Sequence, residues 1–116
     1  MKLERDSKLL RIFMGELDRY RGTPLYEALV LSAKKEGIAG ATVFRGILSY
    51  GPSSRIHTTK LLDLSSDLPI IVEIVDTQEK IDAFLPIADM MLTEAGGGAL
   101  ITIEAAEVIR YQPKKS

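Results

Sequence analysis

The segment GPSSRIHTTK, from Gly51 to Lys60, carries several side chains that could bind an anion or move a proton. Arg55 offers a permanently charged group with five N–H donors. His57 is the single histidine of the chain, and an unperturbed imidazole changes its charge near neutral pH. We predict that this segment contacts a phosphate or another anion; the alternative is that His57 is simply a solvated loop residue.

Three consecutive glycines, at 96–98, form a second candidate anion site. In a tight glycine turn the backbone N–H groups can receive an anion without a side chain in the way. The same glycines could instead serve only to end a helix. Gly46 also has two interpretations: a bulge within a strand, or a point where a ligand approaches the backbone. Arg110 could bind a phosphate or join an ion pair between subunits.

The composition argues against several other kinds of function. The chain has no cysteine, which removes thiol catalysis and thiolate metal sites. It has no nucleophile elbow, Walker P-loop or zinc-protease motif, and one histidine cannot build a multi-histidine metal site. Its 15 basic and 16 acidic residues give a net charge of -1, without the basic block of a nucleic-acid surface. We predict a binding protein that is not an enzyme, with no metal site and no nucleic-acid partner.

The overall character of the chain is that of a small globular protein. With 46% hydrophobic and 27% charged residues, we predict a single domain over residues 1–116. No apolar run approaches the roughly 20 residues that cross a bilayer, and the N-terminal segment is too charged for a signal peptide. We therefore expect a cytoplasmic location.

The first half of the chain predicts a strand, a helix and a second strand. Apolar residues alternate from Lys8 to Met14, as in a half-buried strand. Thr23 is a suitable N-cap, with proline at the first helical position, and the helix is expected to end near Glu36. A strand over Ala41–Ser49 then enters a loop over residues 50–66, which is longer than ordinary hairpin loops.

The second half predicts a strand, a long helix and one or two further strands. The strand Ile70–Val75 is followed by a capping box over Asp76–Glu79, which opens the helix. Pro86 lies inside this helix and predicts a kink. The triple glycine ends the helix, a strand follows over Ala99–Ile103, and Val108–Tyr111 is a candidate for a short fifth strand.

This order, β-α-β-β-α-β, predicts an α+β, ferredoxin-like sandwich, in which two helices cover one face of a four-stranded antiparallel sheet. The uncovered face would carry Leu9, Arg11 and Phe13 with Ile71, Glu73 and Val75. Leaving so much apolar surface in water is costly, so we predict an oligomer whose sheets pack against one another. Candidate members of ion pairs there are Arg11, Arg45 and Glu73. A monomer with an apolar open face is the alternative.

Several segments together carry a family pattern over most of the chain. They are GIAGATV at 37–43, PIIVEIV at 69–75, the triple glycine before Leu100, and VIR at 108–110. This pattern resembles the PII signalling proteins. Through GPSSRIHT at 51–58 and LDLSSDLP at 62–69, the chain more closely resembles a PII-like branch known as a domain of unknown function.

The resemblance implies a homotrimer with three clefts between subunits, each binding an adenine nucleotide. It also implies a flexible loop, called the T-loop, that changes shape with the ligand and docks onto a partner. Thr42, after Gly40, matches a motif near the adenine in PII proteins. The glycines at 96–98 match a phosphate-binding turn, and Arg110 matches the first of two C-terminal arginines that reach phosphates.

The chain also departs from the PII pattern at three places. Ala99 stands where PII proteins have a lysine that acts on phosphates, Gly97 replaces an aspartate, and Gln112 replaces the second arginine. Because charge-assisted contacts to phosphate are strong, losing two cations should weaken the binding of triphosphates. A ligand with fewer phosphates is therefore expected.

These observations predict a PII-like signalling protein that binds an adenine nucleotide or similar anion at clefts between subunits and signals through the 50–66 loop. No cofactor is required, and the candidate effectors are AMP, ADP, ATP and cyclic AMP. The resemblance suggests a membrane transporter or channel as the protein partner. Alternatives are an interaction trimer without a small ligand and a CutA-like ion-tolerance protein. The candidate ligand-binding residues are Gly40, Thr42, Gly46, Gly51, Arg55, His57, Gly96, Gly97, Gly98 and Arg110.

Overall fold

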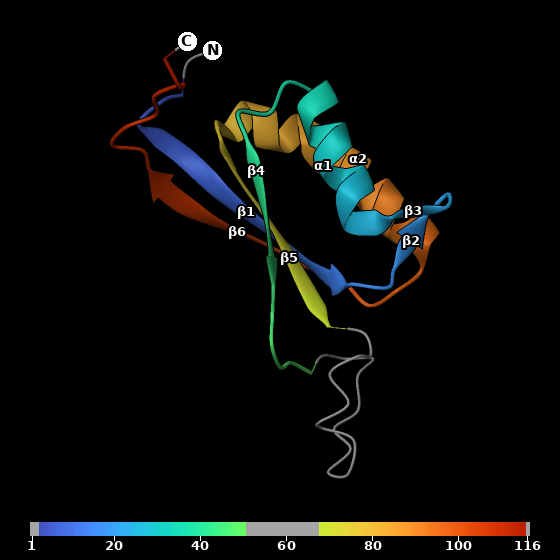
Figure 1. Cartoon of the computed structure of the whole chain (residues 1–116). Coiled ribbons are helices and arrows are strands. Elements are labelled where there is room, and N and C mark those ends of the chain that lie inside the picture. Colours follow the sequence, from blue (N-terminus) through green and yellow to red (C-terminus); the bar gives the residue numbers. More distant parts are fainter. Residues whose placement is uncertain (1–2, 51–67, 116) are drawn as a thin grey trace.

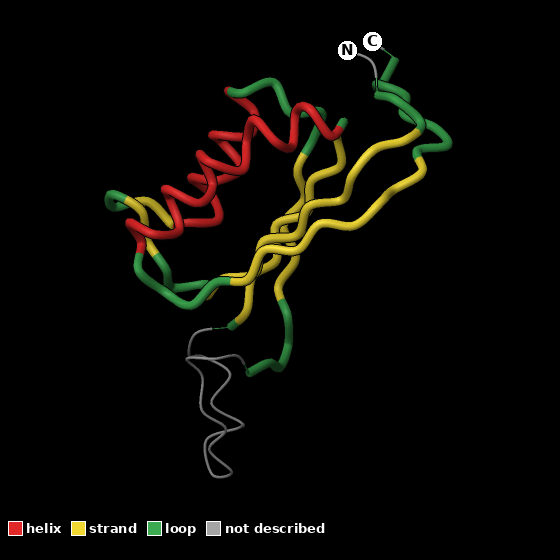
Figure 2. Tube along the Cα trace, turned by 180° about the vertical axis from the view of Figure 1, so that it is seen from behind, coloured by secondary structure: helices red, strands yellow, loops and turns green. Residues whose placement is uncertain are grey.

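The computed structural model describes residues 3–50 and 68–115, and its main feature is a four-stranded antiparallel sheet. The strand order is β4-β5-β1-β6, and both helices lie along one face (Figures 1 and 2). This is the predicted ferredoxin-like α+β fold, which is confirmed. The elements are β1 (Asp6–Gly15), β2 (Arg19–Tyr20), β3 (Thr23–Pro24), α1 (Leu25–Lys35), β4 (Ala41–Arg45), β5 (Pro69–Asp76), α2 (Gln78–Ala95) and β6 (Leu100–Glu107).

Alternation along β1 and β5 builds the core between the sheet and the helices. Leu10 and Ile12 are fully buried beneath the helices, opposite Ile74 and Val72 of β5. Successive side chains of a strand point to opposite faces, so Leu9, Arg11 and Phe13 lie on the other face. Both the strand and its two faces agree with the alternation seen in the sequence.

The start of α1 differs from the prediction. The N-cap position is Pro24, with no side-chain cap, and Thr23 instead pairs with Tyr20 in a small two-stranded sheet. Gly22, at φ 82°, allows the tight turn between these two strands. The N–H of Leu25 donates to the carbonyl of Asp18 at 2.8 Å, so the chain before the helix satisfies one of the N–H groups that have no partner within the helix.

The start of α2 is shifted by one residue from the predicted capping box. Thr77 is the N-cap, and its side chain accepts from the N–H of Lys80 at 3.2 Å. Asp76 cannot take this role because it ends β5 and its buried carboxylate accepts two other N–H groups. These are the N–H of Ala39 at 2.8 Å and that of Thr77 at 2.7 Å. Asp76 therefore joins the segment before β4 to the start of α2.

The ends of α2, β4 and β6 set where the neighbouring connections begin. The triple glycine ends α2, as predicted, and Gly96 takes the left-handed conformation. β4 ends at Arg45 and not at Ser49, and the residues from 108 to 111 form no strand. There the N–H of Val108 donates to the carbonyl of Arg5. The predicted kink at Pro86 stays a prediction. In residues 3–50 and 68–115, no helix is long and apolar enough to cross a membrane.

The double hydrogen bond of Asp76 gives a test of the fold. We expect Asp76→Ala to lower the free energy of unfolding by roughly 2 kcal/mol, because two N–H groups lose their acceptor. Urea unfolding at fixed protein concentration measures the change. The control is Asp89→Ala, an exposed position on α2 where we expect less than about 0.5 kcal/mol. Equal unfolding midpoints for both variants would contradict this role of Asp76.

Candidate functional site

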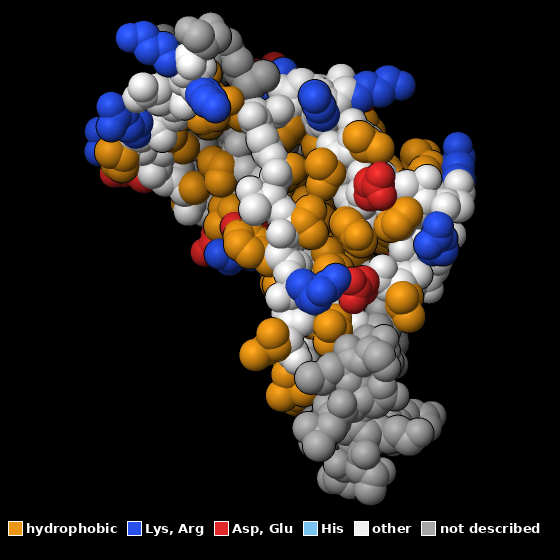
Figure 3. All heavy atoms as spheres, viewed as in Figure 1, with side chains coloured by type: hydrophobic (Ala, Val, Ile, Leu, Met, Phe, Trp, Pro, Cys, Tyr) orange, Lys and Arg blue, Asp and Glu red, His pale blue; other side chains and the backbone are white. Residues whose placement is uncertain are grey.

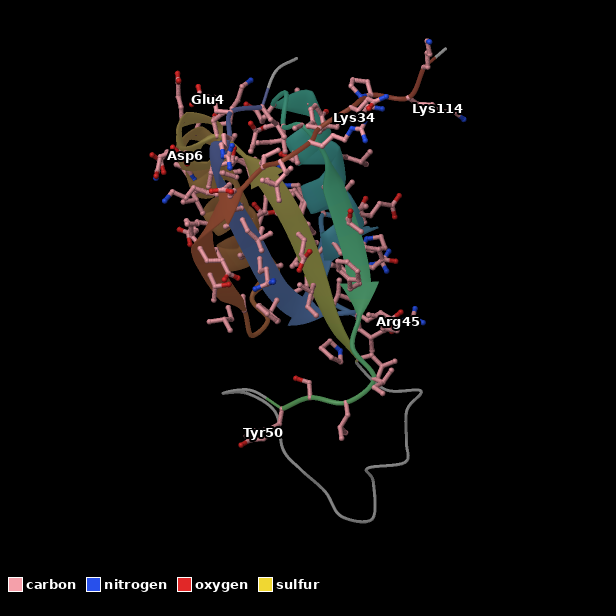
Figure 4. The ribbon with its side chains drawn as sticks, turned by 90° about the vertical axis from the view of Figure 1, so that its left-hand side faces the viewer. Glu4, Asp6, Lys34, Arg45, Tyr50 and Lys114 are labelled. Carbon is pink, nitrogen blue, oxygen red and sulfur yellow. The ribbon has the colours of Figure 1, made fainter. Side chains whose placement is uncertain are left out.

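The sheet face that the helices leave uncovered carries a group of charged side chains; Figure 4 shows the sheet in front of the helices. In the strand register, Thr42, Glu73 and Arg11 follow one another across β4, β5 and β1. The guanidinium of Arg11 donates to Glu73 at 2.8 Å and also contacts Glu104 of β6. The hydrogen bond with Glu73, helped by the charge of Glu104, raises the pKa of Arg11. Arg11 and Glu73 thus form one of the expected ion pairs, within a single chain.

Next to this charged group runs an apolar row that spans the whole sheet. The register places Phe44, Ile71, Phe13 and Leu100 side by side, one from each strand. Phe44 is 47% exposed and Leu100 54% exposed, although both belong to the sheet. Hydrophobic side chains are also visible beside β4 from another side of the molecule (Figure 3). Because contiguous apolar patches on a protein surface are typical of interaction sites, this row is a candidate interaction surface.

The glycine turn, residues 96–98, joins α2 to β6 and has two unused donors. Gly96 takes φ 80° and its N–H closes the helix on the carbonyl of Leu92. In the part of the chain that the structure describes, the N–H groups of Gly97 and Gly98 have no hydrogen-bond acceptor. Two adjacent free N–H groups form the kind of concavity that binds an anion.

Asp18 lies directly against this turn. A Cβ built on Gly97 would lie 2.6 and 2.7 Å from the two carboxylate oxygens of Asp18. The carboxylate is held in place because it accepts the N–H of Gly15 at 3.0 Å. Gly97 has no positive φ, so the nearby carboxylate, and not the backbone conformation, requires a glycine here. Sequence analysis did not identify Asp18 as a site residue, because it lies in a polar connection that contains no recognisable motif.

The base of the 50–66 loop is tied to the end of β1. The N–H of Gly46 donates to the carbonyl of Pro69, and a Cβ on Gly46 would lie 2.6 Å from the Pro69 ring. Because β4 ends at Arg45, Gly46 lies beyond the strand and is not a bulge within it. A side chain at this position would overlap the ring of Pro69, so a glycine is needed here. Arg45, at the end of β4 (Figure 4), pairs with Glu16, whose N–H donates to the carbonyl of Leu68 at 2.8 Å.

Arg110 follows the end of β6 and Gly40 precedes the start of β4. Both strand ends lie at the other end of the sheet, near the chain termini (Figure 1). The C-terminal segment is held there by the hydroxyl of Tyr111, which donates to the carbonyl of Ala39 at 3.1 Å. Gly40 borders a hollow of about 430 Å³ between α1 and the start of β4. Lys34 also lines this hollow. Thr42 does not line this hollow and lies in the row of Glu73 on the open face.

A single chain therefore does not bring the predicted site together. Strand directions place Gly46 and the glycine turn at the loop end of the sheet, on opposite edges, and Arg110 at the far end. Gly51, Arg55 and His57 lie outside the described residues. In the described part, no cluster of three or more His, Cys, Asp or Glu side chains could hold a metal ion.

The α+β fold is the one found in PII-like proteins of known structure. Among solved structures, the chain is similar to CPII of Thiomonas intermedia K12, a nitrogen regulatory PII-like protein bound to ADP, AMP and bicarbonate. The TM-score is 0.65 at 15% identity, over 90% of each chain. A putative PII-like signaling protein of Thermus thermophilus gives a TM-score of 0.61 at 18% identity, over 90% of this chain and 89% of that one.

The family itself is shown by sequence. Residues 7–108 match the DUF190 model, described as "Uncharacterized ACR", and the chain belongs to this family. A UPF0166 protein of Aquifex aeolicus is 46% identical over 104 residues, which cover 88% of this chain and 92% of that protein. The resemblance to a PII-like branch of unknown function is thus confirmed.

The contact between Asp18 and Gly97 can be measured by a double-mutant cycle. We expect Gly97→Ala to lower the free energy of unfolding by about 1–2 kcal/mol, because the new methyl group overlaps the carboxylate. The same change made in an Asp18→Ala background should cost much less, because the overlapping group is gone. Chemical unfolding of the four proteins gives the coupling free energy. Additive effects would mean that the two residues do not touch.

Proposed function

We propose that this protein is a signalling trimer that binds an adenine nucleotide or a similar anionic small molecule in clefts between its subunits. The 50–66 loop carries the signal to a partner protein, with a membrane transporter or channel as the candidate. The molecule acts by binding and does not catalyse a reaction. The observation that carries this proposal is the pair of unused N–H groups on the glycine turn, in a chain of PII-like fold.

Assembly is supported by the open sheet face. Its apolar row joins half-buried and exposed side chains from all four strands, beside the charged group of Arg11. Burial of apolar surface yields roughly 25 cal/mol per Å², so covering this face with another subunit is favourable. Assembly also supplies what one subunit lacks, because the glycine turn and Arg110 stand at opposite ends of the sheet and a neighbour could bring them to one ligand.

The choice of ligand is supported by the turn and by the neighbouring structures. Backbone N–H donors suit phosphate oxygens, and Arg110 adds a cation. CPII, which shares the fold at 15% identity, is described as bound to ADP, AMP and bicarbonate. AMP, ADP, ATP and cyclic AMP are therefore the first effectors to test on this chain.

The short connection that follows β1 supports the proposal that ligand binding changes the position of the 50–66 loop. Glu16 contacts Leu68 and Arg45 on the two sides of the loop base, while Asp18 contacts the glycine turn. A ligand that moves this connection would shift the loop base as well. By reciprocity, a partner bound to the loop would change the affinity for the ligand by the same factor.

Calorimetric titration with the four nucleotides tests the ligand. We expect micromolar affinity for at least one of them, at about one site per subunit. Gly98→Val should weaken that binding at least about tenfold, because a branched side chain would stand in the turn, while the oligomer stays intact. Absence of binding across all four, in a folded trimer, would contradict the nucleotide proposal and favour an interaction trimer without a small ligand.

Light scattering after size-exclusion chromatography tests the assembly. Wild type should elute with the mass of three subunits. Ile71→Glu, in the middle of the apolar row, should dissociate it because a carboxylate would be buried without a partner. Leu31→Glu is the matched control, since Leu31 lies on α1 and is 58% exposed. A trimer that persists in Ile71→Glu would place the subunit interface elsewhere.

A further inference from the structure

We propose that Asp18 determines the charge of the ligand that the glycine turn accepts, favouring a nucleoside monophosphate over di- and triphosphates. The inference rests on the proposed function and adds to it a specificity-determining residue. It starts from one juxtaposition: two free N–H donors, on Gly97 and Gly98, stand beside a carboxylate that uses neither of them.

The position of the carboxylate is well defined. Its oxygens lie within 3 Å of the point where a Cβ of Gly97 would stand, and one of them accepts the N–H of Gly15. The backbone of Asp18 is held too, since its N–H donates to Gly15 and its carbonyl accepts from Leu25. With its backbone held by two hydrogen bonds and its carboxylate by a third, Asp18 keeps its charge beside the turn when a ligand arrives.

The charge of Asp18 is not neutralised by a neighbour. Among residues 3–50 and 68–115, no lysine or arginine forms an ion pair with it. The residue after the turn is Ala99, so the turn does not supply a cation of its own. A phosphate bound to Gly97 and Gly98 would thus have a fixed negative charge close by, in the partly buried setting where charges interact strongly.

Repulsion from a fixed carboxylate grows with the negative charge of the ligand. The N–H donors attract any phosphate, but each added phosphoryl group brings a further charge near Asp18, and the turn itself adds no cation. The balance therefore favours ligands of low charge. This mechanism discriminates by rejecting the wrong ligand, which is a common basis of specificity.

Asp18→Asn is the matched test, because asparagine keeps the size and the oxygen that accepts the N–H of Gly15 while it removes the charge. Asp89→Asn, at an exposed position on α2, makes the same change in net charge away from the turn. Calorimetry measures the affinities of wild type and both variants for AMP, ADP and ATP.

We expect wild type to bind AMP more tightly than ATP. In Asp18→Asn, the affinity for ADP and ATP should rise about tenfold or more, and that for AMP by less than about threefold. Asp89→Asn should match wild type. The proposal is overturned if wild type prefers ATP, or if Asp18→Asn changes the three affinities equally.

A second measurement separates this inference from the proposed function. Pyrophosphate is titrated into isotope-labelled wild type and Asp18→Asn, and the amide signals of Gly97 and Gly98 are followed by nuclear magnetic resonance. Saturable shifts in the variant alone would support the charge barrier even if no nucleotide binds. Equal shifts in both proteins, or none in either, would overturn it, whereas failure of nucleotide binding by itself would count against the proposed function.

Discussion

The two helices cover only one face of the four-stranded sheet, and much else about the molecule depends on what covers the other. That face combines an apolar row, from Phe44 to Leu100, with the guanidinium of Arg11 held between Glu73 and Glu104. Because these charges are already paired within the chain, fewer unpaired charges lose their water when the face is covered. The free-energy cost of burying the face is therefore lower. A second copy of the chain, presenting the same mixture, is the cover we propose.

The same constraint explains why the candidate site is incomplete in a single chain. The glycine turn and the loop base share one end of the sheet, while Arg110 follows β6 at the opposite end. The connection after β1 links the loop base to the glycine turn, because Glu16 contacts the loop base and Asp18 contacts the turn. If assembly adds the arginine of a neighbour, ligand binding, subunit contact and loop position become parts of one equilibrium.

The sequence predicted the features that arise from local patterns. Alternation along the chain placed Leu9, Arg11 and Phe13 on the open face, and register pairs them with Val75, Glu73 and Ile71 as expected. Predictions failed where another contact takes the group that was expected to cap a helix. Thr23 pairs with Tyr20 in the small two-stranded sheet and does not cap α1. The carboxylate of Asp76 accepts the N–H of Ala39 and does not cap α2. The contact between Asp18 and Gly97 joins segments far apart in the chain, so no local pattern indicated it.

Mixing two inactive variants tests whether each ligand site is shared by two subunits. One carries Gly98→Val and the other Arg110→Ala; each should bind the nucleotide effector weakly alone. In mixed oligomers formed after unfolding and joint refolding, about a quarter of the clefts would combine an intact turn with an intact arginine from its neighbour. We predict that calorimetry then recovers a corresponding fraction of wild-type sites. No recovery, in oligomers shown to be mixed, would contradict a shared site.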